Sequence, residues 1–494
     1  MNHGNRIGPR WAVAGLTLAL ALAGCAVGPD YSRPAMDLPD AYKEAGPWKP
    51  AEPGTIDSNL HWWEAYGDPQ LNTLVEAANA ANQTIQQAQA QYRQARAVAD
   101  AARAGFWPTV GVNASAGKAR AKTNGVTAVS NSYAAAIDVS WEPDLWGGVR
   151  RQVEASDAST QASQANLAAA RLSIQAALAQ DYLQLRAVDR EKDLYARTLD
   201  AYTRTLKLTR SQYDAGVALR SDVAQAEAQL KTAEAQSIDL DATRSQLEHA
   251  IAILTGRAPA QFSLAPLPAS QPWMFHVPPV PTGLPSDLLE RRPDIASAER
   301  NVASANAGIG VARAAYFPSL VLSASGGFGA ASFAQWFNAP GRVWSLGALL
   351  AETVFDGGLR KARDAQAVAV FDASAAQYKQ TVLGAFQEVE DNLSTLRVLD
   401  GEARAQDEAV AASRLSEQLA LAQYRAGTTT FLTVAVAQAL TLSNERTAVQ
   451  LRGRQMVASV ALVKAVGGGW NADALQTPDT QALAVATPST KKNE

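Results

Sequence analysis

The sequence has 494 residues, of which 18% are charged and 47% hydrophobic, and its formal net charge is −3. Lys and Arg (44) nearly balance Asp and Glu (47), so the chain lacks the strong basic field that nucleic-acid binding requires. Its single cysteine, Cys25, excludes an intrachain disulfide framework. Long glycine-free runs rich in Ala, Gln and Leu favour extended helices over several compact domains.

The first 24 residues have the layout of a secretory signal peptide. Arg6 and Arg10 precede the apolar run Trp11–Ala23, which is short for a membrane-spanning helix. The run ends in Leu22-Ala23-Gly24-Cys25, which resembles a bacterial lipobox, where cleavage leaves a lipid-modified cysteine as the first mature residue. We therefore predict a signal peptide over 1–24 and a lipid anchor at Cys25, which is the one cofactor-like group expected.

The residues after Cys25 predict an extended segment without a domain of its own. Ala26 follows the cysteine, and the absence of Asp there is typical of lipoproteins sent to the outer membrane. Residues 25–67 are rich in Pro, Gly and Asp over most of their length.

The rest of the chain contains an internal duplication. Ala102–Pro108 (ARAGFWP) returns as Ala312–Pro318 (ARAAYFP), 210 residues later. Other pairs keep nearly the same offset: Gly147-Gly148 with Gly357-Gly358, Tyr213 with Tyr424, and Gly216 with Gly427. We predict two copies of one unit, 68–256 and 287–466, joined by a proline-rich linker over 257–286 and followed by a tail over 467–494.

In the first copy a predicted helix runs from about Asp68 to Gly105 and stops at Phe106-Trp107-Pro108, because the residue before a proline is pushed to extended geometry. Apolar and polar residues then alternate, which is typical of a membrane-spanning barrel strand. We predict a hairpin over 109–142 with strands at Thr109–Gly117 and Tyr133–Glu142. The polar segment Lys118–Ser132 is predicted to be an external loop.

The second copy predicts a hairpin over 318–355, with strands at Ser319–Gly327 and Arg342–Phe355. Val321 is out of phase in the first strand, and Leu349 and Ala351 blur the second, so the register of the last strand stays open. Aromatic residues gather where helix gives way to strand and predict a membrane-interface girdle: Phe106, Trp107, Trp141, Tyr316 and Phe317. A soluble hairpin with core aromatics is the alternative.

A very long helix follows each hairpin. Arg150–Gly216 would span roughly 100 Å at 1.5 Å per residue, and it recurs as Arg360–Gly427. Its apolar residues form two heptad columns of a coiled-coil seam: Leu167, Ile174, Val188, Tyr195 and Tyr202, and Leu178, Leu185, Leu199, Leu206 and Tyr213. A returning helix from about Ser221 to Thr255, with caps expected at Ser221 and Asp222, would pair with half of this seam. The helix before the first strand has about the length needed for the rest.

Two strands per copy give four strands per chain, and a barrel without open edges needs about eight or more. The chain is therefore predicted to oligomerise, although the residues alone do not choose the number of copies.

In this order the features resemble the outer-membrane factors of tripartite efflux pumps, the TolC/OprM-like family, and in particular its lipoprotein branch. The motifs that carry the resemblance are the lipobox, Gly28-Pro29-Asp30-Tyr31, Trp62-Trp63, Leu288–Ile295 (LLERRPDI), the two proline-preceded strands, Tyr424-Arg425-Ala426-Gly427 and Gly467-Gly468-Gly469-Trp470.

The resemblance implies a mainly α fold with a transmembrane β portion. Three chains would form a twelve-stranded outer-membrane β-barrel, four strands from each, continued by a long α-helical coiled-coil tunnel across the periplasm. The homotrimer would join a periplasmic adaptor (membrane fusion) protein and an inner-membrane transporter, often of the resistance-nodulation-division type. Its function would be to conduct drugs or other small molecules passively to the exterior.

Two kinds of site follow from the resemblance. The helix-turn-helix tips would dock the adaptor and contain Tyr213, Gly216, Val217, Tyr424, Gly427 and Thr428. The periplasmic aperture would involve Leu432, Val436 and Ala439. Related pumps often constrict the aperture with an acidic and a basic residue, but Val436 and Ala439 stand at those places here. An apolar constriction is therefore the hypothesis for this chain.

Catalysis and metal binding find little support in the sequence. The four histidines form no HExxH or other paired spacing, and Gly467-Gly468-Gly469 lacks the Lys-Ser/Thr of a phosphate loop. We expect these glycines to end the last helix, and Arg291–Asp294 to begin one at Pro293. Two alternatives stay open: a type I protein-secretion conduit, and a lipid-anchored periplasmic coiled-coil scaffold that conducts nothing.

Overall fold

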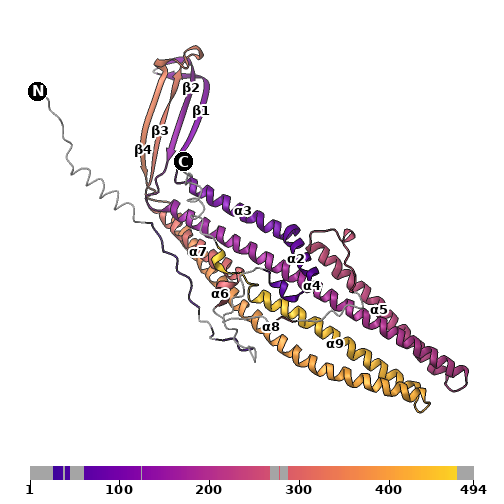
Figure 1. Ribbon diagram of the computed structural model, residues 1–494. Coiled ribbons are helices and arrows are strands. Elements are labelled where there is room, and N and C mark those ends of the chain that lie inside the picture. Colours follow the sequence, from indigo (N-terminus) through magenta and orange to yellow (C-terminus); the bar gives the residue numbers. More distant parts are fainter. Residues whose placement is uncertain are drawn as a thin grey trace, which may run out of the picture.

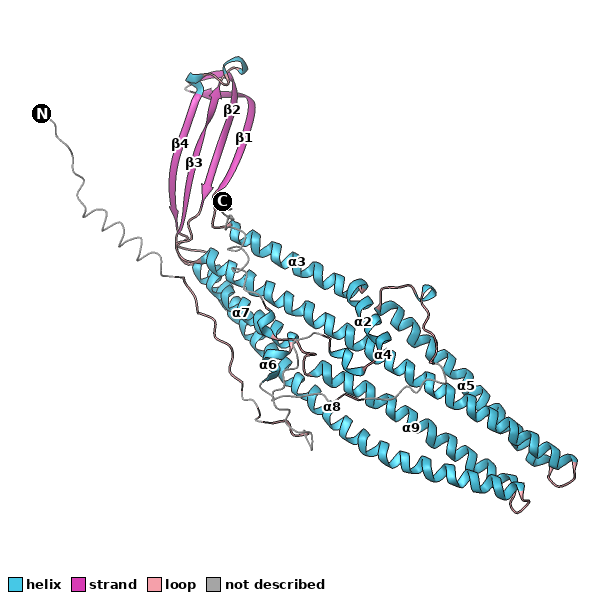
Figure 2. Cartoon of the chain, in the orientation of Figure 1, coloured by secondary structure: helices cyan, strands magenta, loops and turns pink. Residues whose placement is uncertain are grey.

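The computed structural model describes residues 26–36, 39, 41–44, 61–123, 125–267, 277–278 and 287–475. The predicted signal peptide, Cys25, much of the linker and most of the tail lie outside the described residues. The strands form one four-stranded sheet. Figure 1 shows that this sheet projects from one end of a bundle of long helices. In Figure 2 the helices run away from the sheet to two tight turns at the far end of the molecule.

The helical elements of the two copies have matching lengths. α3 (Gln83–Ala104) and α7 (Pro293–Ala314) have 22 residues each, and α5 (Arg220–Leu254) and α9 (Phe431–Ala465) have 35 each. α4 (Gly148–Asp214) and α8 (Leu359–Arg425) have 67 each, which confirms the two long helices. The shorter helical elements are η1 (Trp62–Tyr66), α2 (Pro69–Ala81), η2 (Pro259–Gln261), α6 (Leu288–Arg291), η4 (Phe333–Gln335), η5 (Ala339–Gly341) and η6 (Ala472–Ala474).

The bundle is four helices wide along its whole length. Near the sheet the order is α3, α4, α7, α8, and toward the far end it is α5, α4, α9, α8. The two long helices are continuous; α5 and α9 each have about half the length of a long helix, and α3 and α7 each have about a third (Figure 1). The returning helix therefore shares the seam of α4 with the helix before the first strand, as predicted.

The helix predicted over Asp68–Gly105 is interrupted, so that prediction was wrong. Asn82 has extended backbone angles (φ −66°, ψ 128°) and separates α2 from α3. Its Oδ1 accepts the N–H groups of Thr84 and Ile85 at 2.9 and 3.2 Å, and its Nδ2 donates to the carbonyl of Leu254 at 2.9 Å. The amide thus caps α3 and ties it to the end of α5. Asn side chains can hydrogen-bond nearby backbone groups in place of the helical partners, which explains why the helix breaks at this residue.

The second copy has an equivalent joint between α7 and α9. Pro293 is the first residue of α7, as predicted. The buried Arg292 before it donates from Nη1 to the carbonyl of Ala465 at 2.9 Å and to Glu388 at 2.8 Å. Gly467, with φ +94°, begins the turn after α9, and a Cβ there would stand 2.0 Å from the carbonyl oxygen of Arg291.

The two largest hydrophobic clusters lie at these joints. One is centred on Tyr182 of α4 and includes η1, α2 and the end of α5. The other is centred on Tyr378 of α8 and includes α6, α7, the end of α9 and Tyr42 from the N-terminal segment. The core of the molecule is therefore at the level where the short helices meet.

The strands form one antiparallel sheet in the order β1 (Thr109–Thr123), β2 (Val126–Trp141), β3 (Ser319–Ala330) and β4 (Arg342–Ala351). The loop predicted at Lys118–Ser132 was wrong, because β1 and β2 continue almost to a turn at Gly125, where φ is +82°. β4 ends four residues before the predicted Phe355. Its register, left open by the sequence, pairs Arg342 with Phe328 and Ala351 with Ser319.

Candidate functional site: a membrane sheet, a helical wall and two tip turns

The register places most of the large apolar residues of the four strands on one face. Directly paired residues of an antiparallel sheet share a face, and the pairs run Val110–Val139–Ala324–Leu346 and Val112–Ile137–Gly326–Trp344 across the sheet. The opposite face is small and polar, with Gly111, Asp138, Ser325 and Ser345 in one row. Val321 and Leu349, which blurred the sequence pattern, pair with each other on that second face.

The predicted aromatic residues gather at the end of the sheet nearest the helices. Trp141 donates from Nε1 to the carbonyl of Phe106 at 3.0 Å, while Trp107 is exposed. Phe317 stacks on Trp146 with 4.9 Å between ring centroids, and the guanidinium of Arg360 lies over the ring of Tyr316. We call this set the inner girdle: Phe106, Trp107, Trp141, Trp146, Tyr316 and Phe317.

A second aromatic cluster at the far end of the sheet was not predicted. Tyr133 of β2 contacts Phe333 and Trp336 of the β3–β4 loop, each at 5.8 Å between centroids. Trp336 stacks on Phe337, which contacts Phe328. We call these five residues the outer girdle. The signal was present as three aromatics within Phe333–Phe337, but the alternation of the strands did not reach them.

Each long helix begins at a joint where an aspartate caps its first turn. Asp144 accepts the N–H groups of Val149 and Arg150, both at 2.9 Å. Asp356 accepts the N–H of Gly358 at 2.9 Å and the N–H and Nε–H of Arg360 at 3.1 and 2.7 Å. The Arg360 side-chain contact and these backbone donors lower the pKa of Asp356 to about 2. The segments that follow β2 and β4 are thus hydrogen-bonded to the first turns of the two long helices.

The N-terminal segment lies along α4 and α7 and begins at the joint below the sheet. Val27 donates its N–H to the carbonyl of Trp146 at 3.1 Å, and the buried Arg151 donates to the carbonyl of Val27 and to Asp30. The amide of Asn306 donates to the carbonyl of Pro29 at 3.0 Å. Residues 26–30 are therefore bound to the helices beside the inner girdle.

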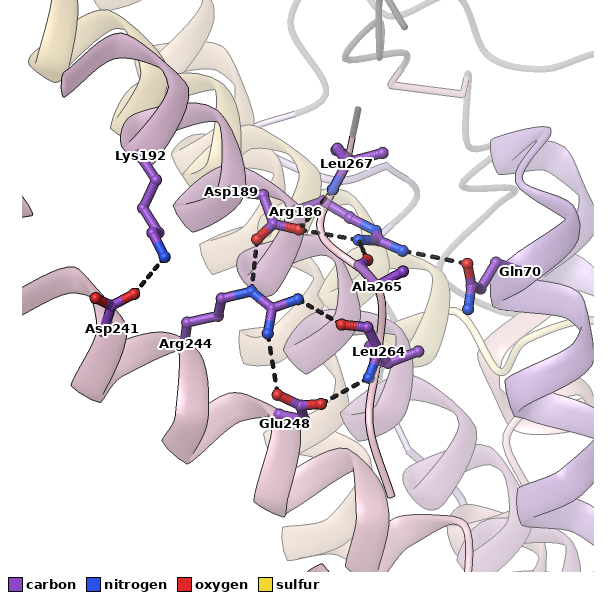
Figure 3. A network of polar contacts seen from close by, with 10 residues as sticks. All are labelled: Gln70, Arg186, Asp189, Lys192, Asp241, Arg244, Glu248, Leu264, Ala265 and Leu267. Atoms are coloured by element: carbon purple, nitrogen blue, oxygen red, sulfur yellow. Dashed lines mark hydrogen bonds and ion pairs between the residues drawn. The ribbon is translucent and has the colours of Figure 1, made fainter. Parts of the chain in front are cut away.

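The described part of the linker is held by a buried ionic network on α4 and α5 (Figure 3). Asp189 accepts from Arg186 at 2.9 Å and from Arg244 at 2.8 Å. The same two arginines donate to linker carbonyls, Arg186 to Ala265 at 3.0 Å and Arg244 to Leu264 at 2.7 Å. The described residues 264–267 of this segment thus lie against α4 and α5.

The two tips are built alike and present different chemistry. After α4, Gly216 (φ +74°) donates to the carbonyl of Tyr213, and Val217 donates to that of Gln212; Gly427 (φ +72°) and Thr428 repeat this pattern after α8. These are Schellman motifs, which end a helix with a left-handed glycine. The caps expected at the start of α5 are corrected in part, since Leu219 is the N-cap and Asp222 accepts its N–H, while Ser221 makes no cap.

Tyr213 is exposed, and so are Val217 and Leu219 beside it. Its counterpart Tyr424 is buried against Phe431, and its hydroxyl lies 3.3 Å from Oγ1 of Thr209. The first tip is therefore apolar at its surface, and the second carries Thr428 and Thr430 there.

The predicted aperture residues share one exposed stripe at the start of α9. Leu432 is 55% exposed and Val436 61%, and Ala439 and Leu440 continue the stripe. Phe431, Val434 and Ala435 point the other way into a buried cluster with α4, α5 and α8. The helix thus holds four apolar side chains on a face that no described residue of the single chain covers.

Neither a metal centre nor a membrane-crossing helix is found among the described residues. No group of three or more His, Cys, Asp or Glu in that part of the chain is arranged to bind a metal ion. The helices in the same part are not apolar enough over a sufficient length to cross a membrane.

Comparison with known proteins gives consistent results. A family model described as outer membrane efflux protein matches residues 74–257 and 284–468, one match in each copy. The pyoverdine export outer membrane protein OpmQ of Pseudomonas aeruginosa is 32% identical over 439 residues, covering 86% of this chain and 91% of that protein. The toluene efflux pump outer membrane protein TtgF of Pseudomonas putida is 30% identical over 476 residues, covering 92% and 96%.

Among solved structures, the outer-membrane channel OprN matches with a TM-score of 0.84 and 34% identity, covering 90% of this chain and all of that one.

Proposed function

Because the chain belongs to the outer membrane efflux protein family, we propose that three copies of it assemble into one closed conduit through the outer membrane and the periplasm. The chain is an outer-membrane efflux channel. The conduit carries its cargo passively and performs no chemistry of its own. One observation carries the assembly: a four-stranded sheet has a continuous apolar face and two unpaired edges.

Closure of the sheet sets the number of chains. β1 and β4 each have one neighbour within the described residues, so a single chain leaves two rows of backbone groups without ladder partners. Two copies would supply eight strands and three copies twelve, and about eight is the smallest barrel that closes, with an interior filled by side chains. A barrel of twelve strands leaves a lumen. The bundle is four helices wide in each chain, so three chains would surround the tunnel with twelve helices. The likeness to a solved outer-membrane channel supports this assembly.

The same arrangement accounts for exposed apolar residues on the two sides of the bundle. α3 and α5 form one side and carry Val98, Ile238 and Ile253; α8 forms the other and carries Leu383 and Val398, among others. In a ring of three, each α8 side would face the α3 and α5 side of the next chain, a head-to-tail contact that closes.

We assign the partners by the chemistry of the tips. The apolar Tyr213, Val217 and Leu219 fit a protein surface better than water, and a periplasmic adaptor is the partner that an efflux channel requires there. An inner-membrane transporter of the resistance-nodulation-division type would supply the energy. The names of the two relatives, which give pyoverdine export and toluene efflux, support small molecules as the cargo.

The lipid anchor on Cys25 remains part of the proposal. The binding of residues 26–30 beside the inner girdle supports this anchor, because acyl chains on Cys25 would then start close to the proposed membrane border. A C25A variant is expected to lose the mass of the lipid in intact-protein mass spectrometry and to be less abundant in the outer membrane.

The exposed stripe on α9 is the proposed constriction of the periplasmic mouth. Leu432, Val436 and Ala439 from three chains would make an apolar ring, and apolar constrictions restrict ion flow by dewetting. A V436S variant should raise single-channel conductance in planar bilayers, and A435S, on the buried side of the same turn, serves as the control. Equal conductance of wild type and V436S would place the constriction elsewhere.

The proposed function is tested by assembly and transport together. The purified full-length protein should run as a heat-dissociable trimer and conduct ions in bilayers. Expressed with its neighbouring adaptor and transporter in a strain that lacks outer-membrane efflux channels, it should restore resistance to toxic compounds. A monomer without conductance would favour the periplasmic scaffold, and restored protein secretion without resistance would favour the secretion conduit.

A further inference from the structure

Three basic residues extend the apolar face of β1 beyond the outer girdle. Val110, Val112, Ala114 and Ala116 lie on the apolar face, and the same alternation continues along the strand with Lys118, Arg120 and Lys122. All three side chains are exposed. Alternate residues of a strand are about 7 Å apart, so the three charges form a column roughly 13 Å long. We call these three residues the basic column.

The charge on this face is of one sign. The two hairpins, 109–141 and 319–351, contain four basic residues and one acidic residue. The fourth basic residue, Arg342, pairs with Phe328 and shares the apolar face. The acidic residue, Asp138, pairs with Gly111 on the opposite face, where Asn113 donates to its carboxylate. Within the hairpins, no carboxylate on the apolar face can neutralise the basic column.

The height of the column follows from the strand pairing. Ala116 pairs with Tyr133, whose ring belongs to the outer girdle. Aromatic girdles mark the borders of the apolar band of a membrane barrel. Lys118 is the next residue on the same face, on the side away from the helices (Figure 1). The basic column therefore stands directly outside the outer border of the apolar band, facing lipid and not the lumen.

We propose that Lys118, Arg120 and Lys122 bind the phosphate groups of the phosphorylated glycolipid that forms the outer leaflet of the outer membrane. Their position is continuous with the lipid-facing surface, and their charge is complementary to phosphate. Lys and Arg can lay their methylene stems along acyl chains while the charged ends reach the polar layer, and Arg offers a planar pair of donors that suits phosphate. Basic clusters beside an apolar membrane surface bind anionic lipid headgroups in this way.

The proposal depends on the placement of the sheet in the outer membrane and not on conduction or on the adaptor. A channel that failed to restore efflux could still bind the lipid, so the two proposals fail separately.

The test measures binding of fluorescent diphosphoryl lipid A to the purified full-length protein in neutral detergent. We expect the K118Q/R120Q/K122Q variant to bind at least tenfold more weakly than wild type, and R120Q alone about threefold more weakly. The K118R/R120K/K122R variant keeps the charges and should bind within twofold of wild type. Every variant is first checked for the heat-dissociable oligomer, and R120Q keeps the test valid if the triple variant does not assemble.

Two further arms identify the ligand and the face. Dephosphorylated lipid A should bind wild type and the triple Gln variant equally, whereas phosphatidylglycerol should not compete with diphosphoryl lipid A at equal concentration. The variant K118A/A119K/R120A/A121R moves two charges to the other face at constant net charge, and it should lose affinity as the Gln variant does. Equal lipid A affinity of wild type and the Gln variant would overturn the proposal, as would full displacement by phosphatidylglycerol.

Discussion

Asp356 shows how a single side chain fixes the joint between the sheet and α8. Its two oxygens receive backbone N–H groups from Gly358 and Arg360 and the Nε–H of Arg360, so the first turn of a 67-residue helix is capped at one point. Asp144 does the same for α4. The Gly-Gly pairs at these joints stand out in the sequence, but the capping aspartates do not, because capping by a residue several positions before a helix has no fixed spacing. Asp144 precedes Arg150 by six residues, and Asp356 precedes Arg360 by four.

The lowered pKa of Asp356 predicts an acid-sensitive joint. The Arg360 side chain and the two backbone N–H groups hold the pKa at about 2, below the unfolded value of about 3.9. A depressed pKa stabilises the folded state above the unfolded pKa, and this contribution is lost as the pH falls from about 4 to 2. D356N should lower the dissociation temperature of the oligomer at pH 7, and its difference from wild type should shrink across that pH window. A difference that stays constant down to pH 2 would contradict the prediction.

The surroundings of Gly467 predict how much a substitution at the joint between α7 and α9 lowers the free energy of unfolding. G467A would place a Cβ 2.0 Å from the carbonyl oxygen of Arg291 at a φ of +94°. Left-handed strain and overpacking together should destabilise the protein by about 2–5 kcal/mol. The matched control is G401A, because Gly401 lies within α8 with no atom within 4 Å of an added Cβ, and Ala there should stabilise by up to about 1 kcal/mol. Chemical denaturation measures both, and equal stability of the two variants would refute the prediction.

At the scale of elements, long periodic patterns were predictable and breaks in them were not. The heptad columns identified α4 within two residues at each end, because burial of one stripe dictates the spacing of apolar residues. The columns also included Tyr213, which is exposed in the structure, whereas its counterpart Tyr424 is buried against Phe431. The break at Asn82 was missed because its cause is a contact with Leu254, which is distant in the sequence.

The upper halves of β1 and β2 were missed for a different reason. Lys118, Arg120 and Lys122 continue the alternation with Ala119 and Ala121, but their charge hid a strand whose outward face leaves the apolar band. Here the charged residues lie on the outward face and the small alanines on the other, which is the reverse of the pattern expected for a membrane-spanning strand, so periodicity in hydrophobicity did not predict the end of β1.

The chemical difference between the tips predicts unequal roles in docking. Val217 is exposed on the apolar tip, and V217D would bring a charge into an interface that otherwise buries the side chain, at a cost of about 1.5–3 kcal/mol or more. The matched control is T428D, at the equivalent position of the polar tip. V217D should reduce drug resistance in the complemented strain by at least tenfold and T428D by less than threefold, at equal amounts of oligomer in the outer membrane. Equal losses would show that both tips dock through the backbone shape of the turn.

At the scale of the whole molecule, one assembly of three chains accounts for both the open edges of the sheet and the two unlike sides of the bundle. The sequence indicated that four strands cannot close, whereas the number of copies came from the resemblance to a family and not from the residues. Which side chains face the lumen also needed the register, because β4 alternates apolar residues on both faces and only its pairing with β3 separates them.

The assembled barrel predicts a cation preference set by one residue. Asp138 is the single charged residue on the lumenal face of the two hairpins, so three chains would place three carboxylates around the lumen. Rings of acidic side chains favour cations. D138N should shift the reversal potential in a KCl gradient toward the value for anions, while D138E keeps the wild-type value. An unchanged potential in D138N would mean that the helical part of the tunnel alone sets selectivity.

The joints at Asn82 and Arg292 also have a mechanical meaning. Both lie at mid-length, so among the described elements only α4 and α8 carry unbroken backbone hydrogen bonding past that level. When half of the helices in a tube are interrupted at the same height, the bending and torsional stiffness of the tube is lowest at that height. The described parts of the N-terminal segment, the linker and the tail pack against the helices at this height, through Tyr42, Leu264 and Trp470. These segments therefore stiffen the tube at the level of the joints. Shortening them should lower the bending stiffness at that level before it lowers the stiffness at either end.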